Sequence, residues 1–302
     1  MASAESSFGP EAGRAAQRRA RSQVAPISDT DVASVAAFMQ AEMGSGVSQA
    51  DWMRVMNPPW KTEQPNHGFF LHQNGRVVGA YLAMYSERIV DGKRRQICNL
   101  GAWCVAEAYR ADGLRMIRSL LRQKGYLFTD LTPNPTVVAL DGRLGFTALD
   151  TTTYAVPNFP WPFRSGGVRV VDSAEQIEGL LTGRDYEIYQ DHAATTVRHA
   201  VLSKDGATCY VMYRREWYKH LPMFATLLRI SNPELFQKCQ AHFYRYLLLR
   251  QRIPATLIEL RVAGHRPTRS ISVPGRTRMF LGENVDPAHI DYLYSELTCL
   301  KD

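Results

Sequence analysis

The sequence predicts an α+β fold, with a mixed, mostly antiparallel sheet and flanking helices. An Asn-Gly pair at 74–75 and Asp-Gly pairs at 91–92 and 205–206 each separate two apolar runs, which is a strong signal for a two-residue hairpin. Apolar residues also recur at helical spacing over 114–124 and 235–247. Hairpins alternating with amphipathic helices are typical of α+β domains.

A near-constant offset indicates that this unit occurs twice. Gly75 and Gly206, in two of the hairpin turns, lie 131 residues apart, and the strand positions Thr129 and Thr256 lie 127 apart. Such an offset over several elements is the mark of a duplicated unit. We therefore expect tandem domains of one fold.

The first unit opens with helices and then a meander. A helix is expected over 29–43, with Asp29 as its N-cap. Glycines and prolines make 44–66 mostly loop, with a short helix near Trp52–Met56. Three antiparallel strands follow: 67–73, 76–90 and 94–105.

The stretch from Ile97 to Arg115 reads as a strand, a turn and a helix that begins near Gly113. The first turn of a helix leaves about four N–H groups without intrahelical partners, and the peptide dipoles make that end partly positive. A strand that leads through a glycine-bearing turn into such an end builds an anion site, most often for phosphate.

The rest of the unit and its repeat follow the same order. After the helix over 114–124 we expect a strand over 126–132, a break at Pro133-Asn134-Pro135, a helix over 136–144 and a strand over 146–156. In the second half we expect the elements 168–171 (strand), 172–181 (helix), 199–204, 207–214 and 223–230 (strands), 235–249 (helix) and 256–262 (strand).

The chain therefore divides into three parts. Residues 1–24 are rich in Ala, Ser and Gly and carry four arginines, so we expect a disordered basic tail. Residues 25–157 form the N-terminal unit, and Pro157, Pro160 and Pro162 mark a linker. Residues 158–302 form the C-terminal unit.

Composition narrows the class of protein. The chain has 302 residues, 45% of them hydrophobic and 22% charged, with no apolar run of membrane-spanning length and no signal-like N-terminus, so a cytoplasmic protein is expected. Five scattered cysteines without a CxxC pair argue against a zinc site or a disulfide framework. The net charge of +7 suits an anionic ligand, and the arginines of the tail (Arg14, Arg18, Arg19 and Arg21) leave nucleic-acid binding as a less favoured hypothesis.

The order strand, Arg110-x-x-Gly113, helix, strand, then Leu144-Gly145-Phe146 resembles the GCN5-related N-acetyltransferases. That family's cofactor loop reads Arg or Gln, two residues, Gly, one residue, then Gly or Ala. Asn134 stands where the family often has an Asn after the next strand. The resemblance covers residues 24–156 and, more faintly, 168–281.

The resemblance implies binding of acetyl-coenzyme A or another acyl-coenzyme A as co-substrate, with no metal. It places one group of residues beside the pantetheine arm or the pyrophosphate: Trp103, Cys104, Val105, Arg110, Ala111, Asp112, Gly113, Leu114, Arg115 and Asn134.

Two departures from the family pattern affect the chemistry. Arg115 replaces the small residue of the loop, so its side chain must either crowd the pyrophosphate or swing outward to pair with a phosphate. Asp141 stands where a Tyr often protonates the departing thiolate, and an ordinary Asp is ionised at pH 7. Glu87, on the neighbouring strand, is a candidate base.

We therefore expect an acyltransferase that moves an acyl group from acyl-coenzyme A to an amine, or less readily a hydroxyl, of a small molecule or amino sugar. The alternative is a module of the same fold that senses coenzyme A or binds a protein without catalysis. The segment Ser231–Phe236 carries no glycine in the loop position, so the second unit is expected to be degenerate. A homodimer stays open.

Overall fold

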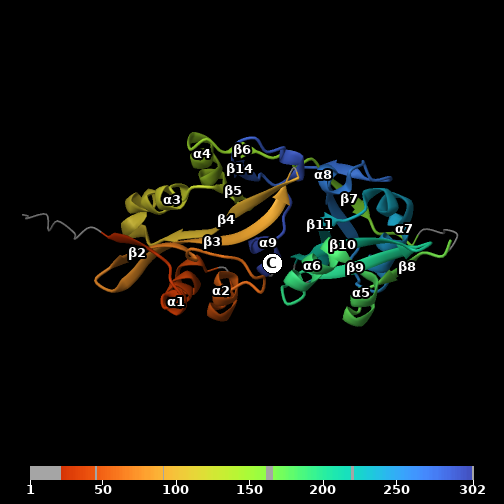
Figure 1. The fold of residues 1–302 in the computed structure, drawn as a ribbon, viewed down its shortest axis with the longest axis horizontal. Coiled ribbons are helices and arrows are strands. Elements are labelled where there is room, and N and C mark those ends of the chain that lie inside the picture. Colours follow the sequence, from red (N-terminus) through yellow and green to blue (C-terminus); the bar gives the residue numbers. More distant parts are fainter. Residues whose placement is uncertain (1–21, 45, 91, 161–165, 219–220, 301–302) are drawn as a thin grey trace, which may run out of the picture.

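The computed structural model describes residues 22–44, 46–90, 92–160, 166–218 and 221–300. The predicted basic tail lies outside these residues apart from its last three, and so do Asp91 and the linker residues Trp161 and Pro162. Within the described residues, two seven-stranded, mostly antiparallel sheets lie side by side (Figure 1). The predicted α+β class is therefore confirmed.

The first half forms the elements β1 (Gln23–Pro26), α1 (Val32–Met43), α2 (Gln49–Met56), β2 (Gly68–Gln73), β3 (Arg76–Val90), β4 (Lys93–Val105), the 3₁₀ turn η1 (Glu107–Asp112), α3 (Leu114–Leu121), β5 (Tyr126–Asp130), α4 (Pro135–Arg143) and β6 (Thr147–Ala148).

The first half ends with β7 (Thr153–Pro157). The second half forms β8 (Arg169–Val171), α5 (Ala174–Leu180), α6 (Gly183–His192), β9 (Arg198–Lys204), β10 (Ala207–Tyr218), β11 (Leu221–Ile230), α7 (Pro233–Leu249), β12 (Ala255–Glu259), α8 (Leu260–Ala263), β13 (Ile271–Val273), β14 (Met279–Leu281), the 3₁₀ turn η2 (Pro287–His289) and α9 (Glu296–Cys299).

The hairpins form where the turn residues predict them. Asn74 and Gly75 have φ of 50° and 75°, and Asp205 and Gly206 have φ of 49° and 81°. Both central residues of a type I′ turn need positive φ, which Asn, Asp and Gly adopt most readily. The meanders β2–β3–β4 and β9–β10–β11 follow, so the predicted strands of these two meanders are confirmed.

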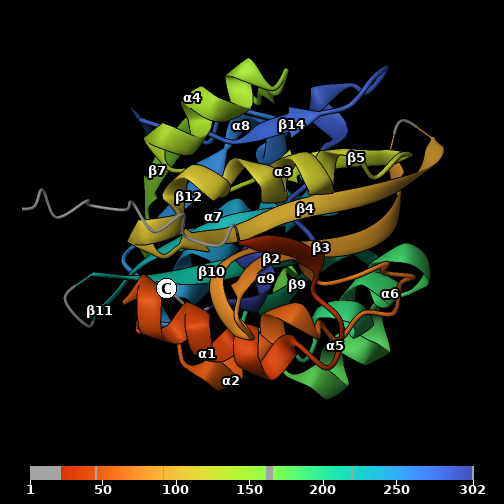
Figure 2. The same ribbon diagram turned by 90° about the vertical axis from the view of Figure 1, so that its left-hand side faces the viewer.

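Each face of the first sheet is covered by a pair of helices. Figure 2 shows α1 and α2 on one side of the sheet and α3 and α4 on the other. The buried side chains of α1 include Val35 and Met39, and those of α3 include Met116 and Leu120. These apolar stripes close separate cores on the two faces. None of the helices in the described ranges is long and apolar enough to cross a membrane.

The two sheets exchange one strand each, which the sequence did not predict. The first sheet runs β1-β2-β3-β4-β5-β14-β6, and the second runs β8-β9-β10-β11-β12-β7-β13. The sixth strand of each sheet thus comes from the other half of the chain. The strand predicted over 146–156 is therefore wrong as one element, because it breaks into β6 and β7 in different sheets. The strand predicted over 256–262 ends at Glu259, where α8 begins.

Polar contacts around the exchanged strands reinforce the link. Arg88 of β3 ion-pairs with Asp291, which follows η2 near the C-terminus. Glu259, at the end of β12, pairs with Arg278 at 3.2 Å and is also bonded by the Tyr292 hydroxyl. The C-terminal segment consequently runs between the two sheets (Figure 1), and one apolar cluster contains residues of both halves.

Candidate functional site

The central feature of the first sheet is a fork between β4 and β5. These strands pair in parallel from Gln96 opposite Tyr126 to Leu100 opposite Asp130. In the described residues, β4 then continues to Val105 paired only with β3. We call the segment 101–105 the arm. All five of its residues are partly exposed, so its outer backbone groups can reach a ligand.

The arm leads directly into a helix start, as predicted. The Ala106 N–H bonds to Val78 O at 3.0 Å, η1 makes one tight turn, and α3 begins after Gly113. A Cβ on Gly113 would lie 3.2 Å from both the Trp103 ring and the Val105 side chain. The glycine therefore lets the helix start pack closely on the arm. Ala111 and Leu114 are exposed beside it.

Charged side chains surround this helix start. Arg115 turns sideways: its Nη1 donates to Ser22 O at 2.6 Å and lies 3.6 Å from Asp112. The Ser22 hydroxyl donates to the other Asp112 oxygen at 2.5 Å. Arg110 and Arg118 are exposed. Three arginines (Arg110, Arg115 and Arg118) against the two carboxylates Glu107 and Asp112 favour a polyanion, and Arg115 does not crowd the loop.

A group of buried carboxyls lies at the fork itself. Asp130 is the last β5 residue paired with β4, and its side chain is 3% exposed. Asp141 comes from α4 and is fully buried. Glu296, from α9, approaches from the C-terminal segment and accepts a 2.8 Å hydrogen bond from Thr132. The sequence predicted only Asp141 of these three.

Burial changes the titration of this group. It raises the pKa of Asp141, and it raises the pKa of Asp130 well above the ordinary range, helped by the charges of Glu296 and Asp141. Neither oxygen of Asp141 has a donor among the described residues other than the neighbouring Asp130 carboxyl. Two carboxyls can hydrogen-bond only if they share a proton, so the pair retains a proton at a pH where an isolated Asp is ionised. The retained proton lies on Asp130, whereas Asp141, with its pKa raised to about 6, is still mostly ionised at pH 7, as the sequence predicted.

Aromatic side chains connect the carboxyl pair with the arm. The Tyr81 ring stacks on Trp103 of the arm, with 4.9 Å between centroids and 6° between planes. The Tyr81 hydroxyl is buried without a hydrogen-bond partner in the described part of the chain, and so is the Trp103 indole N–H. Burial first, and then the charges of Asp130 and Asp141, raise the pKa of Tyr81. Orphaned polar groups at the fork are what a ligand-binding site leaves in a ligand-free protein.

Other predicted site residues have different roles. The Asn134 side chain caps α4 by accepting from Thr136 N and Val137 N, both at 3.0 Å. Cys104 lies on the arm but packs toward the α1 side of the sheet. Glu87 is held by Arg94 at 2.7 Å and Gln96 at 2.8 Å, and Gln96 is four residues before the fork, about 13 Å along β4. The structure does not bring Glu87 to the carboxyl pair.

The second sheet has the same fork, but it is filled. β11 and β12 pair in parallel up to Thr226 opposite Leu257, and α8 then packs against β11. Leu227, Leu228 and Ile230, beyond the fork, are buried. A Cβ on Gly264 would lie 3.2 Å from Pro233 at the start of α7, so the chain after α8 closes over this helix start. The predicted degeneracy of the loop thus has a structural counterpart.

Tyr81, Asp130 and Glu296 were missed by the sequence reasoning. Tyr81 and Asp130 carry no motif of their own, and Glu296 is 155 residues beyond Asp141. Only the fork, which depends on pairing between distant strands, brings them together. Among the described residues, no group of three or more His, Cys, Asp or Glu side chains could hold a metal ion.

No protein-family model and no curated protein matches the sequence. Solved structures do match. A GCN5-related N-acetyltransferase from Anabaena variabilis is similar with a TM-score of 0.58 at 11% identity, covering 86% of this chain and 72% of its own. A protein of Enterococcus faecalis, described as a probable N-acyltransferase, gives 0.56 at 12%, covering 86% and 72%.

A GCN5-related N-acetyltransferase from Kribbella flavida is also similar, with a TM-score of 0.54 at 14% identity, covering 86% of this chain and 70% of its own. Identities this low establish the fold and nothing finer. The resemblance noted in the sequence is therefore confirmed at the level of the fold.

Proposed function

We propose that the chain is an acyltransferase that moves an acyl group from acyl-coenzyme A to an amine of a small molecule or amino sugar. The observation that carries the proposal is the contrast between the two forks. The arm of β4 is accessible and ends at an exposed, arginine-rich helix start, whereas the matching segment of β11 is buried under α8. The first unit is the active one in this proposal, and the second unit is a degenerate tandem copy.

The arm suits the pantetheine part of the co-substrate. Pantetheine carries amide groups, and the outer backbone N–H and C=O groups of 101–105 are placed to bond them in the manner of an added strand. The pyrophosphate then reaches the exposed side of the α3 start, where the positive end of the helix dipole and the guanidinium of Arg110 favour negative charge, although the N–H of the buried Gly113 itself donates to Arg110 O. Asp112 opposes this charge, and its contacts with Ser22 and Arg115 offset that effect.

The carboxyl pair suits the proton transfers of the reaction. The amine nitrogen forms a bond to the thioester carbonyl carbon, and the carbon–sulfur bond breaks. The amine gives up one proton and the departing sulfur takes up one. A pair that shares a single proton can do both: the protonated member, Asp130 in this proposal, donates to sulfur, and the ionised member, Asp141, accepts from the amine.

Two measurements test the proposal. The first is binding of coenzyme A by calorimetry, with Arg110→Glu at the loop and Arg122→Glu at the far end of α3 as a matched control; both arginines are exposed. We expect Arg110→Glu to weaken binding at least tenfold and Arg122→Glu to leave it nearly unchanged. No binding to the wild-type chain at millimolar coenzyme A would contradict the proposal.

The second measurement is release of free thiol from acetyl-coenzyme A in the presence of a panel of amines, amino sugars and amino alcohols. Amine-dependent thiol release supports catalysis. Binding without thiol release from any acceptor, and with no effect of Asp141→Asn on the slow background hydrolysis, would favour the alternative of a coenzyme A-sensing module.

A further inference from the structure

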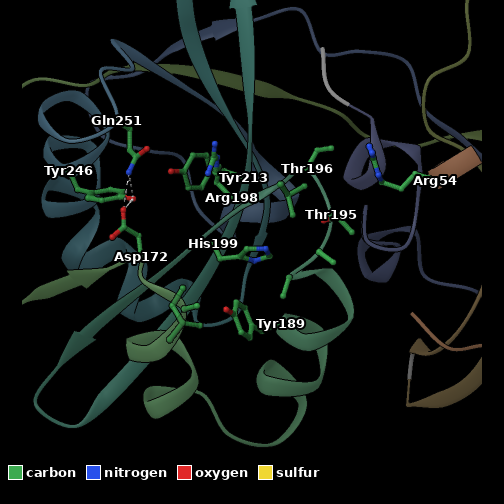
Figure 3. A pocket seen from close by; sticks show the side chains of 15 residues that line it. Arg54, Asp172, Tyr189, Thr195, Thr196, Arg198, His199, Tyr213, Tyr246 and Gln251 are labelled. Carbon is green, nitrogen blue, oxygen red and sulfur yellow. Dashed lines mark hydrogen bonds between the residues drawn. The ribbon is translucent and has the colours of Figure 1, made fainter. Parts of the chain in front are cut away.

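The second half contains a cavity that the acyl-transfer proposal does not use. It has a volume of about 490 Å³ and lies between α6, the start of β9, β10 and the end of α7. In Figure 3, Asp172, Tyr246 and Gln251 form one wall, and Thr195 and Thr196 face them from the other side, with Arg198, His199 and Tyr213 between. A volume of this size accommodates a small organic molecule.

The first half has a matching group of side chains. Tyr213 and Gln251 each lie 128 residues after Tyr85 and Gln123 of the first half. In the first half, the Tyr85 hydroxyl donates to Asn66 at 2.8 Å, and Asn66 also donates to Gln123 at 3.3 Å. Gln123 also donates directly to the Tyr85 hydroxyl at 3.0 Å, so the Asn66 side chain packs against a bonded Tyr–Gln pair.

The connection that carries Asn66 is long. It runs from residue 57 to residue 67 between α2 and β2, and its Trp60 indole donates to the Tyr85 carbonyl at 2.9 Å. In the second half, only residues 193–197 connect α6 to β9. Gln251 donates to the Tyr246 hydroxyl at 2.6 Å, and residues 193–197 of the shorter connection line the cavity beside this group.

Of the charged side chains that line the cavity, Asp172 and Arg54 have hydrogen-bond or ion-pair partners, and Arg198 is the exception. Asp172 accepts from the Tyr246 hydroxyl at 2.7 Å and from Gln251 at 2.9 Å. Arg54, which reaches the cavity from α2 of the first half, is paired with Asp51 at 2.5 Å. Arg198 has neither a carboxylate nor a hydrogen-bond acceptor among the described residues, and its guanidinium supplies up to five donors.

Neutral polar groups lie beside this cation. Burial lowers the pKa of His199 to about 4, so its ring is neutral at pH 7, and its Nδ1 is 2.7 Å from the Tyr210 hydroxyl. The His199 Nε2 is buried without a hydrogen-bond partner in the described residues. β8 pairs with β9 only from Val201 onward, so the outer backbone edge at Arg198–Ala200 also lacks a strand partner there.

We propose that this cavity binds a small organic anion, whose carboxylate or phosphate group is held by Arg198. The remainder of the ligand contacts the rings of Tyr189, His199 and Tyr213. Arg54, from the first half, and Arg198, from the second half, both line the cavity, so a ligand in it lies against both halves of the chain. The proposal concerns the second half and is independent of acyl transfer at the fork.

The test uses the full chain with citrate and inorganic phosphate as probes, at constant ionic strength. We expect both anions to raise the melting temperature of the wild-type chain. Arg198→Gln should weaken binding tenfold or more, whereas Arg169→Gln, an exposed arginine on β8 outside the cavity, should not. Arg110→Glu should leave the effect intact, which separates this site from the proposed phosphate loop.

A second readout reports on the cavity directly. A bound anion favours the charged form of an adjacent imidazole, so the pKa of His199, followed by NMR and assigned with His199→Asn, should rise from about 4 when citrate is added. Equal stabilisation of the wild-type and Arg198→Gln chains, or an unchanged His199 titration at saturating citrate, would overturn the proposal. So would loss of the effect in Arg110→Glu alone.

Discussion

Replacing Asp141 with asparagine should stabilise the protein and impair its chemistry at the same time. Burial raises the pKa of Asp141 from 3.8 to about 6. The folded protein then holds the proton more tightly than the unfolded chain, so the free energy of unfolding falls as the pH rises from 3.8 through about 6. A shift of this size corresponds to about 3 kcal/mol well above pH 6, and to about half of that at pH 5.

The Asp141→Asn variant removes this cost. The new amide is neutral at every pH, and its oxygen can accept the hydrogen bond of the protonated Asp130 carboxyl. We therefore expect the variant to gain up to about 3 kcal/mol over the wild type at pH 8 and about half as much at pH 5. Thiol release from acetyl-coenzyme A should fall by at least tenfold, because an amide cannot accept the proton of the attacking amine.

Urea denaturation at both pH values measures the first effect, and the thiol assay measures the second. Glu87→Gln is the control, since that carboxylate is partly exposed and paired with Arg94. It should change stability by less than about 1 kcal/mol at either pH. If Asp141→Asn is no more stable than the wild type at pH 8, the carboxyl is not desolvated as described, and the proton-sharing account of the fork fails.

Three further outcomes are expected. Phe280→Ala, at a position 6% exposed in β14, should lower the free energy of unfolding by about 3 to 5 kcal/mol in urea titrations and reduce coenzyme A binding, because β14 pairs with β5 beside the fork. Cys104, the one partly exposed thiol of the described chain, should react first with 5,5′-dithiobis(2-nitrobenzoate), and saturating acetyl-coenzyme A, which has no free thiol, should slow that reaction; equal rates with and without acetyl-coenzyme A would count against binding along the arm. Tyr81→Phe removes an unpartnered buried hydroxyl, so calorimetry should find it at least as stable as the wild type, whereas a loss above about 1 kcal/mol would mean that the hydroxyl has a partner.

Short sequence patterns predicted the turns and helices whose formation depends mainly on residues close together in the chain. The Asn-Gly and Asp-Gly turns placed the hairpins, because positive φ at two successive residues admits few residue types. The spacing of Met116, Ile117 and Leu120 placed α3 and its buried face. The helix start at Gly113 was predicted from the strand and the glycine-bearing turn that precede it. What these signals could not supply was the partner of each strand at the far edge of its sheet.

The strand pairing at that edge determines where the candidate site forms. β5 could be predicted as a strand, but not that its outer neighbour is β14, about 150 residues downstream. The broken strand at 146–156 shows the reason: four residues between β6 and β7 let the chain leave one sheet and enter the other. Periodicity reports that a segment is extended and half-buried, and it carries no information on which sheet it joins.

The strand exchange also bears on how the acid at the fork is maintained. The C-terminal segment that supplies β14 to the first sheet continues into α9, which brings Glu296 toward Asp130. Its charge raises the pKa of Asp130, so the second half contributes to proton retention at a site formed by the first. A tyrosine hydroxyl would need no such support, because it is protonated at pH 7. The Asp130 carboxyl does, because without burial and neighbouring charge it would be ionised at pH 7. Glu296→Gln should therefore lower the pKa of the pair and shift the alkaline limb of the rate profile to lower pH, with the fold intact because the Thr132 hydroxyl can still donate to the amide oxygen. A rate profile unchanged in Glu296→Gln would show that burial alone retains the proton, and that the second half has no part in the chemistry.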